Sequence, residues 1–182
     1  RIVNLSTRAV AGNTSDTILI AGFVVTGSVP KRVLIRGVGP ALTQFGVAGA
    51  LARPSLAVYS GSTVLAQNAG WTTTADTSAI TAAAQQSGAF AFAATSQDAA
   101  LILNLAPGPY TAQISGVAGT TGVALVEVYE ADATPSTLVN LSCRARVGTG
   151  GDILIAGFVI GGATAKTVLV RAIGPTLGGF GV

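Results

Sequence analysis

The sequence predicts an all-β fold, a β-sandwich or jelly-roll-like repeat unit that carries one short helix. Three observations support this prediction. Short runs rich in β-branched and aromatic residues recur at a spacing of roughly 8 to 12 residues, with Gly, Pro and Ser between them. Only one stretch has the composition of a helix. The beginning of the chain also returns at its end, so the unit is itself repeated.

The repeat relates residues 1–47 to residues 137–182. With one gap at Thr17, 26 of the 46 paired positions are identical, and the period is 135 to 136 residues. We therefore divide the chain into a complete repeat, residues 1–135, and the first third of a second repeat, residues 136–182. Self-similarity at a fixed period is typical of arrays whose units bury surface against their neighbours.

The strands of the first repeat are expected wherever an apolar, β-branched run ends at turn residues. Ser60-Gly61-Ser62 indicates a hairpin, and the segment Ala106-Pro107-Gly108-Pro109 indicates a turn. Several runs are apolar on both faces, which predicts strands that are covered on both sides. The expected strands are residues 3–7, 18–25, 33–36, 55–59, 63–67, 99–105, 110–116 and 123–129.

One helix is expected at residues 79–86, which are rich in Ala. Asp76 is its candidate N-cap, and Gly88 is a suitable residue to end it. In the second repeat, residues 139–143 copy the first strand. Two further copied strands are expected at residues 153–160 and 167–173.

The composition restricts the classes of function. Hydrophobic residues make up 49% of the chain and charged residues only 9%, against roughly 25% charged in an average globular protein. The mean hydropathy is +0.63, yet the longest apolar run, Ile18–Val25, is shorter than the roughly 18 to 20 residues of a membrane helix. The net charge of +3 is thinly spread, so we expect neither a membrane span nor nucleic-acid binding. The excess apolar surface indicates buried sheet faces or subunit interfaces.

Catalytic and metal-binding chemistry finds little support. The chain has no His, which excludes Ser-His-Asp and Cys-His catalysis and His-ligated metals. Its one Cys, Cys143, stands where the first copy has Thr7, so a role shared by the repeats does not depend on it. Glu127, Glu130 and Asp132 form an acidic cluster, which we interpret as a solvated strand end in preference to a calcium site. We expect no enzyme activity, no cofactor and no metal.

Arg36 and its copy Arg171 lie inside apolar strand runs, where an unpaired charge would be costly. We expect each to be at least half buried and paired with a carboxylate. The candidate partners are Glu127 and Asp16, and Asp152 is the copy of Asp16 in the second repeat. A contact between Arg36 and an anion or a glycan is the functional alternative.

Two resemblances bear on the fold and the role. The segments 96–116 and 121–129 resemble the bacterial pre-peptidase C-terminal β-sandwich, with a strand, a Pro/Gly turn, a Tyr-Thr strand and a Gly-rich loop before a final strand. The whole unit resembles tandem repeats of long secreted proteins from environmental bacteria, through residues 20–24 and 33–40. The second resemblance implies secretion and a structural or adhesive role.

We therefore expect a structural subunit of an extracellular filament or cell-surface array, a homopolymer assembled head to tail through β-strand contacts. The alternative is a surface-adhesion or glycan-binding module, for which Trp71 and Tyr59 are the possible contact residues. The C-terminal third either completes a neighbouring subunit by strand addition, the arrangement we favour, or packs on the first copy as a pseudo-equivalent half. The expected assembly residues are Ile153, Leu154, Ile155, Phe158, Val168, Leu169 and Val170.

Overall fold

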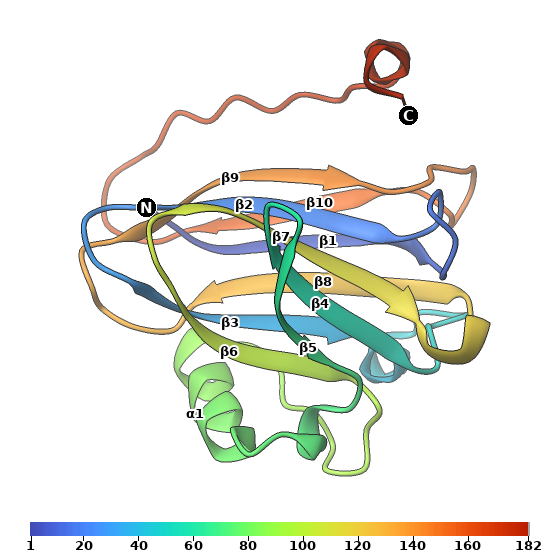
Figure 1. Ribbon diagram of the computed structural model, residues 1–182, viewed down its shortest axis with the longest axis horizontal. Helices are drawn as coiled ribbons and strands as arrows, with labels where there is room; N and C mark the ends of the chain where they lie inside the picture. Colours follow the sequence, from blue (N-terminus) through green and yellow to red (C-terminus); the bar gives the residue numbers. More distant parts are fainter. Residues whose placement is uncertain (182) are drawn as a thin grey trace.

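The computed structural model describes residues 1–181, and its strands form one ten-stranded antiparallel sheet (Figure 1). The order is β5-β4-β7-β2-β9-β1-β8-β3-β6, and β10 pairs with β1 outside this path. The prediction of an all-β fold with one short helix is confirmed. The strands are β1 (Ile2–Ala11), β2 (Leu19–Thr26), β3 (Lys31–Val38), β4 (Pro54–Ser60), β5 (Thr63–Asn68), β6 (Ala99–Leu105), β7 (Gly108–Gly116), β8 (Gly122–Glu130), β9 (Thr137–Arg144) and β10 (Ile155–Ile160).

The sheet curls until its two end strands, β5 and β6, approach each other. The side-chain oxygen of Asn68, the last residue of β5, accepts a hydrogen bond from the backbone N–H of Ala100 in β6 at 3.1 Å. The enclosed core follows the alternation of the strands, as in β2, where buried and half-buried residues alternate. The largest fully buried apolar side chains of this core are Leu5, Leu19, Phe23, Ile35, Leu51, Leu56, Ile114 and Leu138.

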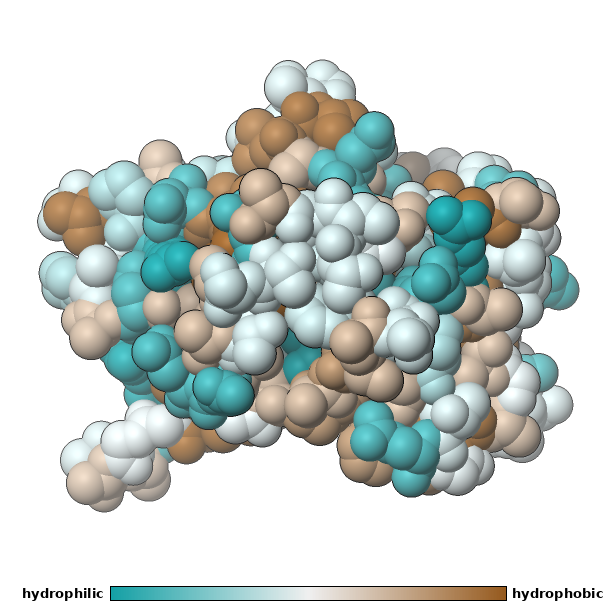
Figure 2. Space-filling model, turned by 90° about the horizontal axis from the view of Figure 1, so that it is seen from below, coloured by the Kyte–Doolittle hydropathy of each residue, from teal (hydrophilic) through white to brown (hydrophobic). Residues whose placement is uncertain are grey.

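A second apolar layer lies on the outer face of β3 and β6, under α1 (Thr77–Ser87). Leu34 packs there against Trp71 and Ile80, while its neighbours in β3 face the main core. The strand is thus covered on both sides, as its apolar sequence predicts. Gly88 ends α1 at φ 74°. Figure 2 views the molecule from the side of α1, where apolar residues lie in separate groups among hydrophilic ones. Within residues 1–181, the structure contains no helix that is both long and apolar enough to cross a membrane.

Four short 3-10 turns complete the described part of the chain, residues 1–181. Two of them occupy equivalent positions in the two copies and have nearly the same conformation. Their preceding glycines, Gly39 and Gly174, have φ of −132° and −129°, and their closing glycines, Gly46 and Gly181, have φ of 72° and 74°. The turns are η1 (Pro40–Phe45), η2 (Trp71–Thr73), η3 (Val117–Gly119) and η4 (Pro175–Phe180).

The second copy forms two of its three expected strands. β9 and β10 are present, although β10 begins at Ile155 and leaves Ile153 and Leu154 outside. The strand expected at residues 167–173 does not form, and this segment runs away from the sheet toward η4 (Figure 1). Its counterpart, β3, is held between β6 and β8. The second copy has no counterparts of those two strands within the described residues, so its backbone has no ladder partners here.

Candidate functional site

The first two strands of the chain are paired with strands of the second copy. In the β1–β10 ladder Leu5 lies opposite Phe158, and in the β2–β9 ladder Leu141 lies opposite Phe23. Leu141 is the repeat copy of Leu5, and Phe158 is the copy of Phe23. One pairing is thus formed twice, with the two copies exchanging roles. We call β1, β2, β9 and β10 the exchange seam.

The equivalence extends along both ladders. Ser6 faces Gly157 in one ladder, and Ser142 faces Gly22 in the other. A Cβ added at Gly22 would lie 2.5 Å from the Ser142 hydroxyl oxygen, and one added at Gly157 would lie 2.8 Å from that of Ser6. Each ladder therefore holds a glycine against a serine at the same repeat position, and this pair marks the register.

In each copy, the turn between the two strands (β1 and β2 in the first copy, β9 and β10 in the second) is closed by a backbone hydrogen bond; we call these strands the two arms of the copy. The backbone N–H of Gly12 donates to the carbonyl of Thr17 at 2.9 Å, and that of Gly148 donates to the carbonyl of Asp152 at 2.7 Å. Beyond these turns the arms separate, and each arm takes its partner from the other copy. Within each copy the two strands therefore do not pair with each other, and each pairs with a strand of the other copy at the equivalent repeat position. Such an exchange of identical elements is a low-cost route to association.

The Arg36–Glu127 pair expected from the sequence is present under α1. The Arg36 side chain is almost fully buried, and its Nε lies 3.3 Å from Oε2 of Glu127 on the adjacent strand β8. Arg36 Nη1 donates to the carbonyl of Phe90 at 2.9 Å. The hydroxyl of Tyr129 donates to Oε1 of Glu127 at 2.8 Å. Pairing and hydrogen bonding thus offset part of the desolvation of both charges.

Burial dominates the electrostatics of this cluster. It lowers the pKa of Arg36 and raises the pKa of Glu127, and in both cases the partner charge opposes the shift. The Arg36 Cζ atom also lies 4.2 Å from the ring centroid of Phe90 and 4.0 Å from that of Phe92. Arg36 Nη2 finds no hydrogen-bond acceptor among residues 1–181. A cavity of about 70 Å³ lies beside it, lined by Arg36, Trp71, the two phenylalanines and α1.

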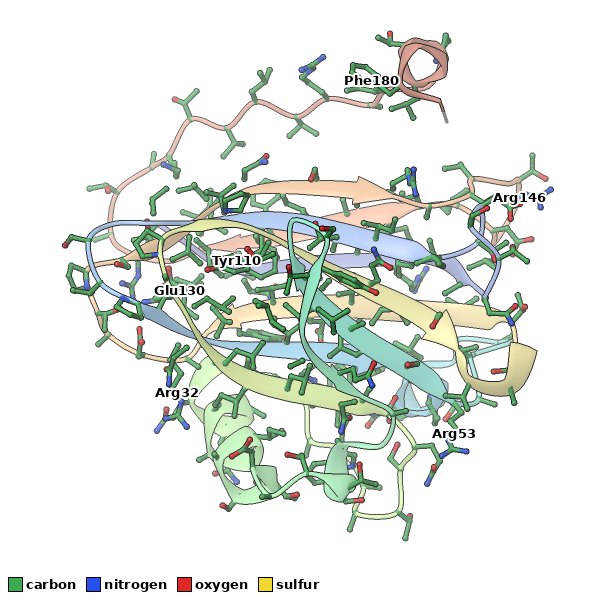
Figure 3. The ribbon with its side chains drawn as sticks, in the orientation of Figure 1. Arg32, Arg53, Tyr110, Glu130, Arg146 and Phe180 are labelled. Carbon is green, nitrogen blue, oxygen red and sulfur yellow. The ribbon has the colours of Figure 1, made fainter. Side chains whose placement is uncertain are left out.

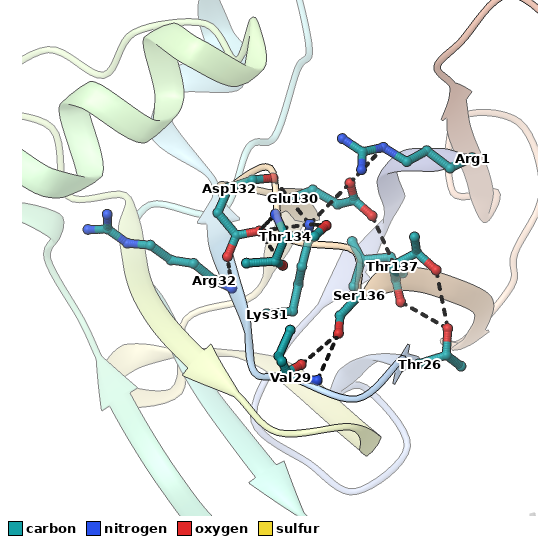
Figure 4. Close-up of polar contacts among 11 residues, drawn as sticks. Arg1, Thr26, Val29, Lys31, Arg32, Glu130, Asp132, Thr134, Ser136 and Thr137 are labelled. Carbon is teal, nitrogen blue, oxygen red and sulfur yellow. Dashed lines mark hydrogen bonds and ion pairs between the residues drawn. The ribbon is translucent and has the colours of Figure 1, made fainter.

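A second buried charge, Lys31, closes the junction between the repeats (Figure 4). Its Nζ lies 2.7 Å from Oδ1 of Asp132 and 3.5 Å from Oε2 of Glu130, and the lysine side chain is fully buried. Arg1 Nε reaches the same Glu130 oxygen at 3.2 Å. Glu130 Oε1 also accepts the backbone N–H of Leu138, at the start of the second copy. The network therefore ties β8 and β3 to the beginning of β9.

This network corrects the interpretation of the acidic cluster as a solvated strand end. Glu127 and Glu130 are buried and Asp132 is half-buried, because each faces a cation on another strand or segment. The sequence signal for Lys31 was weak, since it lies at the start of a strand where a lysine is normally exposed. Asp98 was also missed: it is fully buried and accepts the N–H groups of Gly39 at 2.6 Å and Ala41 at 3.2 Å.

The remaining predicted ion-pair residues lie outside these clusters. Asp16 is exposed in the first turn, 3.8 Å from Arg146, and its pKa is lowered mainly by a hydrogen bond from the Thr14 hydroxyl. Asp152 is exposed in the equivalent turn. Arg171 is also exposed and forms no ion pair within residues 1–181. The expectation of burial is wrong for Arg171, because its segment lacks the flanking strands that bury Arg36.

The two aromatic residues considered for glycan binding do not form a shared surface. Trp71 is only 8% exposed, and its indole N–H donates to the carbonyl of Ala93 at 3.2 Å. It packs edge-on against Phe92 in the layer under α1. Tyr59 is half-buried in β4, a different part of the sheet. The prediction of Trp71 as a surface contact is therefore wrong, because its ring completes an apolar layer.

The predicted assembly residues divide into two groups. Ile155 and Phe158 lie in β10 and take part in the β1–β10 ladder, next to Ile153 and Leu154 in the preceding turn region. Val168, Leu169 and Val170 lie in the extended segment, away from the sheet, as does Phe180 at its end (Figure 3).

Comparison with known proteins adds no assignment: no protein-family profile, curated protein or solved structure matches the chain. Within residues 1–181, the structure brings together no group of three His, Cys, Asp or Glu residues that could hold a metal ion. The exchange seam is therefore the feature from which a function can be argued.

Proposed function

We propose that this chain is a structural subunit of an extracellular filament or surface array, in which successive repeats are joined by β-strand contacts. The reciprocal exchange between β1–β2 and β9–β10 carries the proposal. It makes strands of one repeat continuous with the sheet of the next, through β8-β1-β10 on one side and β7-β2-β9 on the other. A joint built in this way has two full ladders and no flexible linker.

The junction residues support a mechanical role. Glu130 accepts the N–H of Leu138, and the Ser136 hydroxyl donates to the carbonyl of Val29 at 2.6 Å. The chain between the repeats is thus held to the first repeat on both sides of the joint. The extracellular location rests on the resemblance to repeats of secreted bacterial proteins. The same ladders, if formed between chains, would give strand addition between subunits.

Electron microscopy and light scattering of the purified chain test the proposal. We expect elongated assemblies whose mass rises with protein concentration, and single particles for a chain truncated after Pro135, which lacks β9 and β10. Filaments of unchanged repeat from the truncated chain would overturn the proposal, as would a full chain that stays a single particle at every concentration.

The natural Cys143 offers a direct test of the exchange. It lies opposite Ala21 in the β2–β9 ladder, so Ala21→Cys should form a disulfide with Cys143 under mild oxidation. The matched control is Val24→Cys, which lies in the same strand away from Cys143. The variant Thr7→Cys/Ala21→Cys/Cys143→Ser tests the alternative, a closed β1–β2 hairpin in the first repeat, in which residues 7 and 21 would lie opposite each other and form the disulfide. Cross-linking in this last variant, and none in Ala21→Cys, would show that the exchange does not occur.

A further inference from the structure

We propose that the second copy is a receiving surface for strands β4 to β8 of a further repeat, whose β7-type and β8-type strands pair with the free edges of β10 and β9. This inference rests on the proposed function, because it requires that repeats join through the exchange seam. The partner it identifies is a polypeptide with the sequence of residues 48–136, the segment that contains β4 to β8.

Apolar side chains of the second copy are exposed where their counterparts in the first copy are buried, and this partner would cover them. Phe158 is 43% exposed, whereas its counterpart Phe23 is 2% exposed; Leu169 is 86% exposed, whereas Leu34 is 0% exposed. The first-copy residues owe their burial to strands β6, β7 and β8 and to α1, which have no counterparts among the described residues of the second copy. A large exposed apolar surface marks an interaction site. The second copy also exposes Ile155, Val168, Val170 and Ile173.

The free edge of β10 has a specific missing partner. β2, its counterpart, pairs with β9 on one edge and with β7 on the other, where Phe23 lies opposite Tyr110. The rings of Phe23 and Tyr110 stack with centroids 5.8 Å apart. Among residues 1–181, β10 pairs only with β1. Repeat equivalence therefore places a Tyr110-type residue of the incoming repeat opposite Phe158.

The free edge of β9 follows the same rule. β1 pairs with β8 on the edge that does not carry β10, and Leu5 lies there opposite Val128. β9 has a single bridge on its corresponding edge, between Leu138 and Ile2. The incoming β8-type strand should therefore place a Val128-type residue opposite Leu141.

The extended segment and η4 complete the set of missing contacts. Phe45 packs edge-on against Phe90 at 4.9 Å between ring centroids and is 57% exposed, whereas its copy Phe180 is 79% exposed. An incoming repeat supplies the equivalent of Phe90 to Phe180, and a Glu127-type carboxylate to Arg171. The buried ion pair absent from the second copy would then form.

An intact copy of this chain is not the partner of these two free edges, because its own β7 and β8 are already paired on both edges. Assembly of intact chains would instead use the β1–β10 and β2–β9 ladders formed between chains. The partner must supply these strands without their usual neighbours. A chain that continues past Val182 with a sequence like residues 48–136 meets this condition.

The experiment extends the chain after Val182 with a second copy of residues 48–136. Hydrogen exchange is then measured at residues 155–160 and 167–173 in the original and extended chains. We expect exchange in both segments to slow by at least about 100-fold, as for strands inside a cooperative core. A matched extension carries Ala112→Asp in the added copy, at a fully buried position of β7; it should not protect these segments.

The Ala21→Cys cross-link to Cys143, measured in the same extended chain, separates the two proposals. If the cross-link forms and residues 155–160 and 167–173 remain unprotected, the receiving surface is refuted and the exchange stands. If the cross-link does not form, the proposed function itself fails. Protection that persists with the Ala112→Asp extension would also refute the inference, because it would not come from the predicted β7-type pairing.

Discussion

Gly22 lies directly opposite Ser142, and a Cβ on Gly22 would come within 2.5 Å of the serine hydroxyl oxygen. Gly157 and Ser6 repeat this pair in the other ladder of the exchange seam. Because side chains in a strand alternate between faces, a slip of one residue would move every side chain of the strand to the other face. The glycine–serine pairs therefore give both ladders the same defined register.

We predict that Gly22→Val destabilises the protein by about 1–3 kcal/mol, because the added side chain overpacks the space filled by Ser142. Gly151→Ala is the matched control: a Cβ there meets nothing within 4 Å, so its effect should be within about 0.5 kcal/mol. Urea unfolding measures both. The reversed pair, Gly22→Ser with Ser142→Gly, should recover most of the stability that Gly22→Ser alone loses. Equal losses in Gly22→Ser and in the reversed pair would contradict the proposed register.

The buried ion pair gives a second prediction. Arg36→Leu should cost about 3–5 kcal/mol of unfolding free energy, because it leaves the Glu127 carboxylate buried without its cation. The double variant Arg36→Leu/Glu127→Leu should cost less than the single one. Arg171→Leu is the control at the same repeat position, and because Arg171 is exposed its effect should stay within about 0.5 kcal/mol. A double variant no more stable than Arg36→Leu would argue against the pair.

The two copies show which structure local sequence determines. η4 forms with the same backbone conformation as η1, although the Asp98 side chain that holds η1 has no counterpart in the second copy. The glycines and the proline of this turn are therefore sufficient to set its backbone conformation. Residues 167–173, by contrast, copy β3 and yet form no strand, because a strand depends on hydrogen bonds from neighbours distant in the sequence. The apolar pattern predicted the strands of a complete repeat but not which of them would find partners.

The same distinction holds for the site. The cost of an unpaired charge in an apolar run predicted a carboxylate partner for Arg36, and strand register supplied Glu127. The repeat itself was visible, and of the two arrangements expected for the second copy the structure shows the less favoured one, in which it packs on the first copy as a pseudo-equivalent half of the same chain. The exchange of strands was not visible, because a closed hairpin and an exchanged one have the same local sequence and the same ladder. The sequence signal for Lys31 was only weak, since its burial depends on Glu130 and Asp132 at the far end of the repeat.

Asp132 gives a prediction on pH. Burial alone would raise its pKa, but hydrogen bonds from Lys31, from the Arg32 backbone and from Thr134 lower the pKa below its ordinary value of 3.8. The stability that these contacts provide is therefore present above about pH 4 and is lost as the pH falls through the lowered pKa. We expect Asp132→Asn to cost about 1–2 kcal/mol at pH 7, and the difference from the original protein to shrink below pH 4. Asp76→Asn, at an exposed helix cap without a side-chain cap bond, is the control. A difference that is constant from pH 7 to pH 3 would contradict this account.

The last prediction uses one repeat position in its two environments. Leu34 is fully buried between β3 and α1, whereas its copy Leu169 is 86% exposed in the extended segment. Leu34→Asp places an unpaired charge in an apolar layer and should cost more than about 4 kcal/mol, so we expect loss of cooperative unfolding. Leu169→Asp should change the free energy of unfolding by less than about 0.5 kcal/mol. In the chain extended by residues 48–136, however, the same Leu169→Asp should prevent protection of residues 167–173 from hydrogen exchange. If Leu169→Asp destabilised the original chain as much as Leu34→Asp does, the extended segment would be packed in solution and the second copy would have no surface free for a partner.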